Sequence, residues 1–409
     1  MTRADSGTFD ATGFSLLELL VALAVTMTLA AAVLDVMRPV LGQFHAEPEA
    51  IDGQQRLRAA CSLIATDLGM AGAGMYAGAS PAGLDAFMAA VVPRRVGRAS
   101  PDVAGSFHAS PRCPTRCASA VTIAYVPPTA AQTTIESALA AGAADTAVST
   151  RPGCPAGSPT CGFSVGTRVA VLDQDLGADV YTVTNIAGSS LHLEPRDVDA
   201  RAHVRGLWMT EVISHTYYLE DDGVTTFRLR EFDGYKSDLP LIDDVVDFRV
   251  ELLGDPLLPQ VLRPASATVP AAVTYGPAPP RGEVAVPPWP AGENCLFTVD
   301  DSGRQVPRPE LAPEGAPGGP FVPLPAARLV DGPWCPSGAA GANRYDADLL
   351  RVRQVRVTLR VQAASAVFRG PAGSLFLHGG SARVGDRYVP DLEVHFDVTP
   401  RNLNRGTLR

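Results

Sequence analysis

Lysine is almost missing from this sequence of 409 residues: Lys236 is the single example, and arginine supplies the remaining positive charge. A phosphate-binding loop of the Walker type needs a lysine directly after a glycine, and Lys236 follows Tyr235, so the sequence excludes that loop. The formal net charge is −9. Because a nucleic-acid-binding protein needs a basic surface to replace counterions, we expect no nucleic acid among the partners of this chain.

Catalytic motifs are missing as well. The sequence has no His-Glu-x-x-His, no Gly-x-Ser-x-Gly and no dinucleotide-binding glycine pattern after an expected strand. Its seven histidines are scattered, and none stands at metal-ligand spacing from another histidine or from a cysteine. We therefore expect neither an enzyme nor a bound cofactor or metal.

The best metal candidate is the acidic segment that holds Asp173, Asp175 and Asp179. Alternating carboxylates before a glycine can wrap a calcium ion, but this segment lacks the later bidentate glutamate of calcium-binding loops. The alternative, which we favour, is a solvated polar turn between two strands.

Cysteine is sparse but informative by position, because six of the seven cysteines form three close pairs. The pairs are Cys113 with Cys117, Cys154 with Cys161, and Cys295 with Cys335, which leaves Cys61 unpaired. In an exported domain such pairs indicate disulfides. The alternative is a metal site with thiolates from Cys113, Cys117 and Cys154.

The N-terminal segment changes character at residue 14. Residues 1–13 are polar, and the apolar run Phe14–Leu34 is about long enough to span a bilayer as a helix. The alternative is an ordinary signal peptide or signal anchor. Glu18 lies inside the apolar run, where an ionised carboxylate is costly and is therefore usually functional.

The segment Gly13–Leu23 resembles the class III signal of type IV prepilins and of type II secretion pseudopilins: a glycine, then a phenylalanine, then a glutamate four residues on. The resemblance implies that a prepilin peptidase cuts between Gly13 and Phe14 and methylates the new amine. It also implies that Glu18 pairs with the Phe14 amine of a neighbouring subunit, which would offset the burial cost of both charges.

Residues 39–74 read as the second half of this helix. Proline removes a helical hydrogen bond, so we expect a kink or short break between Pro39 and Pro48. Apolar residues then recur at steps of four and three, which predicts a stripe that packs on a sheet. The stripe consists of Leu57, Cys61, Ile64 and Leu68, with Arg56, Arg58 and Asp67 off it and glycines 69, 72 and 74 ending the helix.

The rest of the chain favours strands, and we expect an α+β fold: a long pilin-type N-terminal helix and a globular head on an antiparallel sheet. The expected head covers 75–253, with a β insert at 163–195, and continues in 346–409. Short β-branched runs predict its strands at 121–125, 168–172, 180–184, 191–193, 212–219, 225–230, 245–253, 352–361 and 392–398.

A Pro/Gly-rich insert separates the two parts of the head. Residues 254–345 hold 19 of the 36 prolines of the chain. Proline disfavours helix and central strand, so we expect an exposed, partly disordered loop that is closed by Cys295 and Cys335.

Four segments also resemble PilW-like minor pilins and J-type pseudopilins, namely Gln54–Gly72, Leu239–Val250, Val352–Leu359 and Val394–Leu403. This resemblance implies a minor pilin that helps to prime or cap a type IV pilus, with other minor pilins and the prepilin peptidase as partners. It implies a single pass through the inner membrane, with the head in the periplasm before assembly. The alternatives are a J-type pseudopilin of type II secretion and an anchored envelope protein or adhesin that never polymerises.

Overall fold

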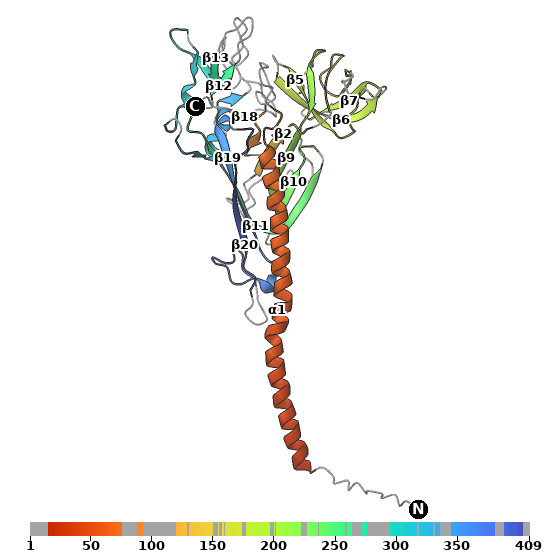
Figure 1. The fold of residues 1–409 in the computed structure, drawn as a ribbon, viewed down its shortest axis with the longest axis vertical. Helices are drawn as coiled ribbons and strands as arrows, with labels where there is room; N and C mark the ends of the chain where they lie inside the picture. Colours follow the sequence, from red (N-terminus) through yellow and green to blue (C-terminus); the bar gives the residue numbers. More distant parts are fainter. Residues whose placement is uncertain are drawn as a thin grey trace, which may run out of the picture. The chain divides into compact units, whose positions relative to one another are not determined.

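The fold is described from a computed structural model of the chain (Figure 1). The structure describes residues 15–75, 88–93, 120–128, 131–149, 154, 158, 160–173, 177–196, 200, 202–221, 227–235, 237–257, 260–263, 272–275, 295–303, 305–316, 319–329, 332–335, 345–380 and 388–403. Two compact units divide the chain: unit 1 is Met1–Gln54 with Gln362–Asp391, and unit 2 is Gln55–Val361 with Leu392–Arg409.

Helix α1 runs without interruption from Leu16 to Met70, through both Pro39 and Pro48. Of the kink or short break expected between the two prolines, the break is therefore wrong. Each proline removes one N–H donor but has a φ angle that suits a helix, so the hydrogen bonds on either side can carry the helix across. The helix ends where expected, since Gly72 and Gly74 adopt φ angles of 75° and 63° just beyond it.

An antiparallel sheet of eight strands forms the centre of unit 2, which confirms the broad α+β prediction. Its order is β1-β2-β9-β10-β11-β19-β20, and β16 pairs with β11 off this path. The strands are β1 (Val91–Val92), β2 (Ala120–Tyr125), β9 (Ile213–Asp221), β10 (Phe227–Phe232), β11 (Asp238–Gly254), β16 (Val322–Leu324), β19 (Val352–Val361) and β20 (Leu392–Val398).

The part of α1 that lies in unit 2 packs into the core of this sheet, as the apolar stripe predicts. Leu57, Ile64 and Leu68 are buried in one cluster with residues of β2, β9, β11 and β19. Cys61 of the expected stripe is only half-buried, and Ala60 beside it is buried. A small residue at this position lets the helix backbone approach the sheet closely.

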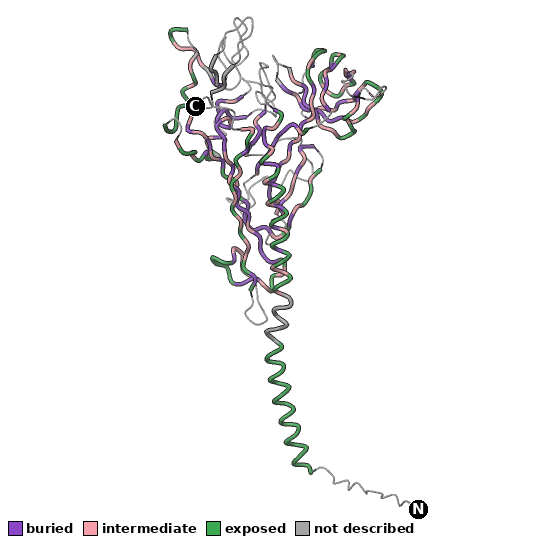
Figure 2. The backbone as a smooth tube through the Cα atoms, in the orientation of Figure 1, coloured by how far each residue is buried: buried purple, intermediate pink, exposed green. Residues whose placement is uncertain are grey.

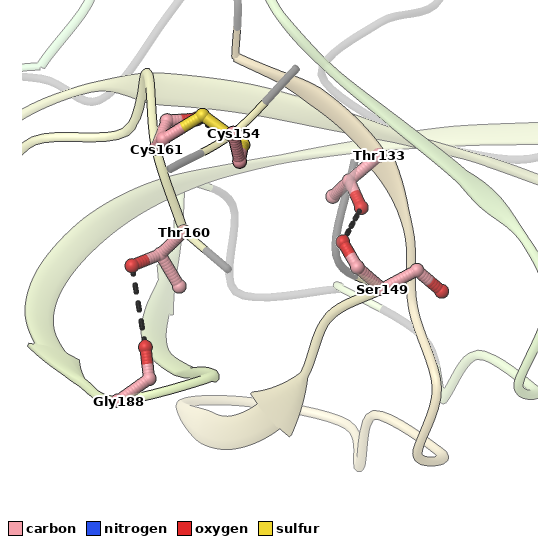
Figure 3. The surroundings of a disulfide bond; sticks show 6 residues. All are labelled: Thr133, Ser149, Cys154, Thr160, Cys161 and Gly188. Atoms are coloured by element: carbon pink, nitrogen blue, oxygen red, sulfur yellow. Dashed lines mark hydrogen bonds between the residues drawn. A yellow bond between two sulfur atoms is a disulfide. The ribbon is translucent and has the colours of Figure 1, made fainter. Parts of the chain in front are cut away.

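A second sheet, of six strands, closes into a small barrel. Its order is β3-β8-β5-β6-β7-β4, and a bridge between Ile135 and Val148 joins the two ends. Thr133 Oγ1 donates to the Ser149 carbonyl across the same seam (Figure 3). The strands are β3 (Gln132–Thr134), β4 (Ala144–Ala147), β5 (Arg168–Asp173), β6 (Gly177–Ala187), β7 (Ser190–Pro195) and β8 (Trp208–Glu211).

The barrel has a core of its own and is larger than the predicted insert. Its interior is filled by Ile135, Leu139, Val148, Val169, Val171, Tyr181, Val183, Leu191, Leu193 and Met209. The expected insert, 163–195, contains only β5, β6 and β7. The other three strands are short and rich in threonine and alanine, so their sequences carry a weak strand signal and the barrel is completed by pairing.

Parts of the Pro/Gly-rich insert pack onto the core of unit 2, so the expectation of an exposed loop is wrong for those parts. Leu311, Leu324 and Leu329 are buried in the same cluster as the main sheet. The elements are short: β12 (Gln260–Arg263), β13 (Ala272–Tyr275), β14 (Phe297–Val299), β15 (Gln305–Pro307), η2 (Pro309–Leu311), η3 (Ala326–Leu329), β17 (Trp334–Cys335), β18 (Tyr345–Asp346) and η4 (Ala347–Arg351). Leucines spaced between prolines supply enough apolar surface to anchor an otherwise irregular segment.

In unit 1, the segment between β19 and β20 packs on α1. It contains the short 3₁₀ helix η5 (Ala366–Phe368). Glu49 of α1 accepts a hydrogen bond from the backbone N–H of Ala364. The buried Arg369 guanidinium donates to the carbonyls of Ala363 and Ala364, at 2.6 and 2.9 Å, and so satisfies groups that this turn would otherwise leave unpaired.

Candidate functional site

The first part of α1 is a long apolar surface. Leu16–Met37 has 22 residues and a mean hydropathy of 2.3, and none of it is buried within the chain (Figure 2). A helix of this length rises about 33 Å, which matches the hydrocarbon thickness of a bilayer. The segment is thus long and apolar enough for a membrane anchor or a signal sequence, and water is a poor solvent for it.

Glu18 is the only ionisable side chain between Leu16 and Leu34. Its carboxylate accepts a 3.0 Å hydrogen bond from the backbone N–H of Ser15, and Ser15 Oγ accepts one of 3.2 Å from the N–H of Leu17. This reciprocal pair is a capping box, which satisfies two N–H groups that the helix start would leave unpaired. The Ser-x-x-Glu spacing of Ser15 and Glu18 is a sequence signal of this cap, and it was not among the predicted features.

The surroundings of Glu18 on α1 are apolar. Leu17, Val21 and Val25 lie on its face of the helix, together with Ala22 and Thr26. Thr26 Oγ1 donates to the carbonyl of Ala22 at 2.6 Å, so its hydroxyl is satisfied inside the helix. The carboxylate is therefore the one strongly polar group that this face offers to a neighbour. Gly13 and Phe14, the predicted processing residues, lie outside the described residues.

Asp67, near the other end of α1, is buried and holds the helix to the sheet, although it lies off the predicted apolar stripe. Tyr217 Oη donates to its carboxylate at 2.6 Å, His215 Nδ1 lies 2.6 Å from it, and Tyr125 Oη lies at 3.3 Å. Tyr125 belongs to β2, and His215 and Tyr217 belong to β9. An amphipathic pattern cannot identify a buried carboxylate whose partners are distant in sequence.

The charge of Asp67 is stabilised by this arrangement. Burial alone would raise the pKa of Asp67, but the hydrogen bonds from His215, Tyr217 and Tyr125 and the charge of His215 hold it below its ordinary value. Burial and the adjacent Asp67 charge raise the pKa of Tyr125 to about 12, so its hydroxyl stays protonated and can donate. Asp67 is therefore an ionised anchor between helix and sheet.

His215 bridges two carboxylates. Its Nε2 lies 3.6 Å from Glu231 Oε1 on β10, while its Nδ1 contacts Asp67. Burial raises the pKa of Glu231. The charge of His215 opposes this shift but is smaller than the effect of burial. The cluster thus joins α1 to three strands of the sheet through ionisable groups.

A second buried charge organises the Pro/Gly-rich insert. Arg351 donates to the carbonyls of Pro256 at 2.8 Å, Leu311 at 2.7 Å and Ala312 at 3.0 Å. Its Nε lies 2.7 Å from the Asp348 carboxylate, and Arg351 is fully buried. A planar guanidinium can bind several carbonyls at once, so this residue fixes irregular backbone that has no regular partner.

Two of the three predicted cysteine pairs are confirmed as disulfides, Cys154–Cys161 and Cys295–Cys335, with Cα–Cα distances of 5.6 and 5.3 Å. Figure 3 shows the first of these beside the seam of the barrel. Cys113 and Cys117 lie outside the described residues. Burial raises the pKa of the Cys61 thiol to about 11, so it stays protonated and unreactive.

The acidic segment that was weighed as a calcium candidate forms the connection between β5, which ends at Asp173, and β6, which begins at Gly177. Asp179 lies on β6 with its carboxylate 3.0 Å from Nε2 of the buried His203. Asp175 lies outside the described residues. Within the described ranges, no three histidine, cysteine or acidic side chains gather in a group that could hold a metal ion.

Comparisons of this chain with known protein families, with curated proteins and with solved structures found no match.

Proposed function

We propose that this chain is a prepilin, a membrane-anchored subunit whose leader, residues 1–13, is removed before α1 packs among the helices of neighbouring subunits in a filament. One observation carries the proposal. The exposed apolar run Leu16–Leu34 has a single ionisable residue, Glu18, which lies in the first turn of α1, four residues after Phe14. An ordinary membrane anchor has no need of a carboxylate there.

The continuity of α1 supports this function. The exposed segment Leu16–Met37 and the packed segment Leu57–Leu68 belong to one helix. A filament subunit needs such a connection, because the helices assemble in the centre while the folded parts stay outside.

After cleavage, Phe14 carries a positive amine. The Glu18 carboxylate of a neighbouring subunit pairs with that amine and sets the axial offset between the two helices. Before assembly, the same carboxylate is occupied by the N–H of Ser15, at 3.0 Å. The capping box thus satisfies Glu18 in the free subunit, and assembly exchanges a backbone donor for a charged one.

Within this class, we propose a minor pilin that primes or caps a type IV pilus, with other minor pilins as partners. The subunit is inserted in the inner membrane with its folded part in the periplasm until it assembles. A J-type pseudopilin of type II secretion is the second candidate, because the same sequence segments resemble both families. Deletion separates them: loss of pili indicates the first, and loss of protein secretion with normal pili indicates the second.

The proposal is tested by the mass and the N-terminal peptide of the protein extracted from membranes. We expect a chain that begins at N-methylated Phe14. The variant Gly13→Val provides the control, since a β-branched residue before the cleaved bond should block the peptidase and leave the full-length chain. A native chain that begins at Met1, or that is cut after the apolar run, would contradict the proposal and indicate a signal anchor or a signal peptide.

A further inference from the structure

The main sheet of unit 2 has two very different edges. At one edge, β1 has only two residues, Val91 and Val92, and both are buried. At the other edge, β20 has seven residues that pair with β19 without a bulge. Among the residues that the structure describes, β20 has a strand on one side only. Proteins commonly interrupt such edges with proline or a bulge, and β20 contains neither.

The apolar layer beneath the sheet is incomplete at β20. Val357 and Leu359 on β19 are completely buried, and they pair directly with Phe396 and Val394 on β20. Phe396 and Val394 pack against the same core but stay only partly buried. Val355 on β19 is likewise fully buried, whereas its partner Val398 on β20 is only partly buried. An additional strand beside β20 would cover this side of the core, with a gain in buried apolar area.

The opposite face of β20 is acidic. Glu393 and Asp397 flank His395, and the two carboxylates contact Arg360 and Arg356 of β19 at 3.3 and 2.9 Å. They keep exposed fractions of 36% and 37%, so they remain accessible from the outer side of the strand. A cross-strand neighbour with arginine or lysine opposite them would be favourable.

This charge pattern argues against a second copy of the chain as the occupant. Antiparallel pairing of two β20 strands about His395 would place Glu393 of each copy opposite Asp397 of the other. Like charges directly opposite each other destabilise a strand pair. A strand that complements β20 would have a sequence pattern like that of β19, in which apolar residues alternate with Arg356 and Arg360.

We propose that the free edge of β20 binds an extended segment of a partner protein, alternately apolar and basic, as an added strand of the sheet. Main-chain hydrogen bonds would supply affinity, and the acidic face of β20 would select the basic partner. The proposal concerns unit 2 alone, and it holds whether or not the chain is a filament subunit.

The test uses the full-length chain in detergent micelles and a synthetic peptide with the sequence of β19, Val352–Val361. The control peptide has its three arginines replaced by glutamate. Fluorescence anisotropy measures binding, and hydrogen–deuterium exchange locates it. We expect saturable binding of the basic peptide only, with slower exchange in Leu392–Val398.

Three variants make the test specific. The double variant Glu393→Gln/Asp397→Asn should weaken binding at least tenfold, and Glu393→Arg/Asp397→Arg should abolish it. Glu251→Gln is the matched control, because Glu251 is an exposed carboxylate on β11, away from the edge, and its variant should bind like the parent. Thermal unfolding of each variant verifies that it is folded.

Several results would overturn the proposal. These are absence of binding, equal binding of both peptides, protection outside Leu392–Val398, or unchanged affinity of the folded Gln/Asn double variant. Self-association of the chain that disappears in the double variants would identify a second copy as the occupant and would also overturn it. Failure of leader cleavage would contradict only the proposed function, because the peptide assay does not depend on processing.

Discussion

Tyr217 and Asp67 meet inside unit 2, where the tyrosine hydroxyl donates a 2.6 Å hydrogen bond to the carboxylate. The tyrosine belongs to β9 and the aspartate to α1, 150 residues apart in the sequence. A hydrogen bond to a buried charged group stabilises a protein more than one between neutral groups. This contact is therefore a strong point of attachment between the helix and the sheet.

Replacement of Tyr217 by phenylalanine should lower the free energy of unfolding by about 1–3 kcal/mol, because Asp67 would lose a charged hydrogen bond while the ring stays packed. Tyr125→Phe is the comparison, since its hydroxyl lies 3.3 Å from Asp67 and should matter less. Urea unfolding of the full chain in detergent measures both. A smaller effect for Tyr217→Phe than for Tyr125→Phe would contradict the assigned geometry.

Acid should weaken the attachment of α1. The folded state lowers the pKa of Asp67 below its ordinary value, so on acidification the unfolded chain takes up this proton first. The stabilisation from Asp67 is complete above the unfolded value, about pH 4, and is lost as pH falls through the lower folded value. Glu231 has the opposite effect on the pH dependence of stability. Burial raises its pKa, so on acidification the folded chain takes up this proton first, which favours the folded state.

The variant Asp67→Asn isolates the contribution of Asp67 to this pH dependence. We expect it to be less stable than the parent at pH 7, and to lose less stability than the parent between pH 5 and pH 3, in urea unfolding at each pH. A parallel decline of both proteins would show that Asp67 does not have the lowered pKa that its hydrogen bonds imply.

The apolar stripe of α1 supports a paired test of packing. Leu68 is fully buried, whereas Leu63 on the same helix is 37% exposed. Leu68→Ala should lower the free energy of unfolding by about 2–5 kcal/mol, because it leaves a cavity in the core. Leu63→Ala should cost less than about 1 kcal/mol. Chemical unfolding measures both, and similar losses would mean that this face of α1 is not packed as described.

The two disulfides should differ in their effect on stability. Cys295 and Cys335 are 40 residues apart, and Cys154 and Cys161 are 7 apart. Loop-closure entropy predicts losses of about 4 kcal/mol for Cys295→Ala/Cys335→Ala and about 2.4 kcal/mol for Cys154→Ala/Cys161→Ala. Calorimetry of the two double variants tests the order. The reverse order would show that constraint of the unfolded chain is not the main effect.

Glu18 has two roles, capping and assembly, which two substitutions separate. Glu18→Gln retains an oxygen acceptor for the N–H of Ser15 but removes the charge. We expect this variant to be cleaved after Gly13 and excluded from filaments. Ser15→Ala weakens the cap and retains the carboxylate, and we expect it to assemble. Immunoblots of sheared filaments and of membranes measure both steps, and normal assembly of Glu18→Gln would refute the charge pairing.

The local features of this protein were readable from its sequence because they depend on neighbours along the chain. The apolar run with Glu18 at its start, the stripe of Leu57, Ile64 and Leu68, and the alternation of β19 each have a short period that one element imposes. The order of the cysteines suggested the pairs 154/161 and 295/335, but connectivity itself does not follow from sequence.

Tertiary structure alone decided the features whose partners are distant. Asp67 is polar and lies off the predicted apolar stripe, but Tyr125, His215 and Tyr217 bring donors to it and make its burial favourable. Arg351 likewise turns a proline-rich segment into folded structure by binding carbonyls that no sequence pattern relates to it. Whether every polar group has a hydrogen-bond partner and whether a core is completely covered are decided only in the folded chain. The closed barrel and the edge at β20 therefore could not be predicted from the sequence.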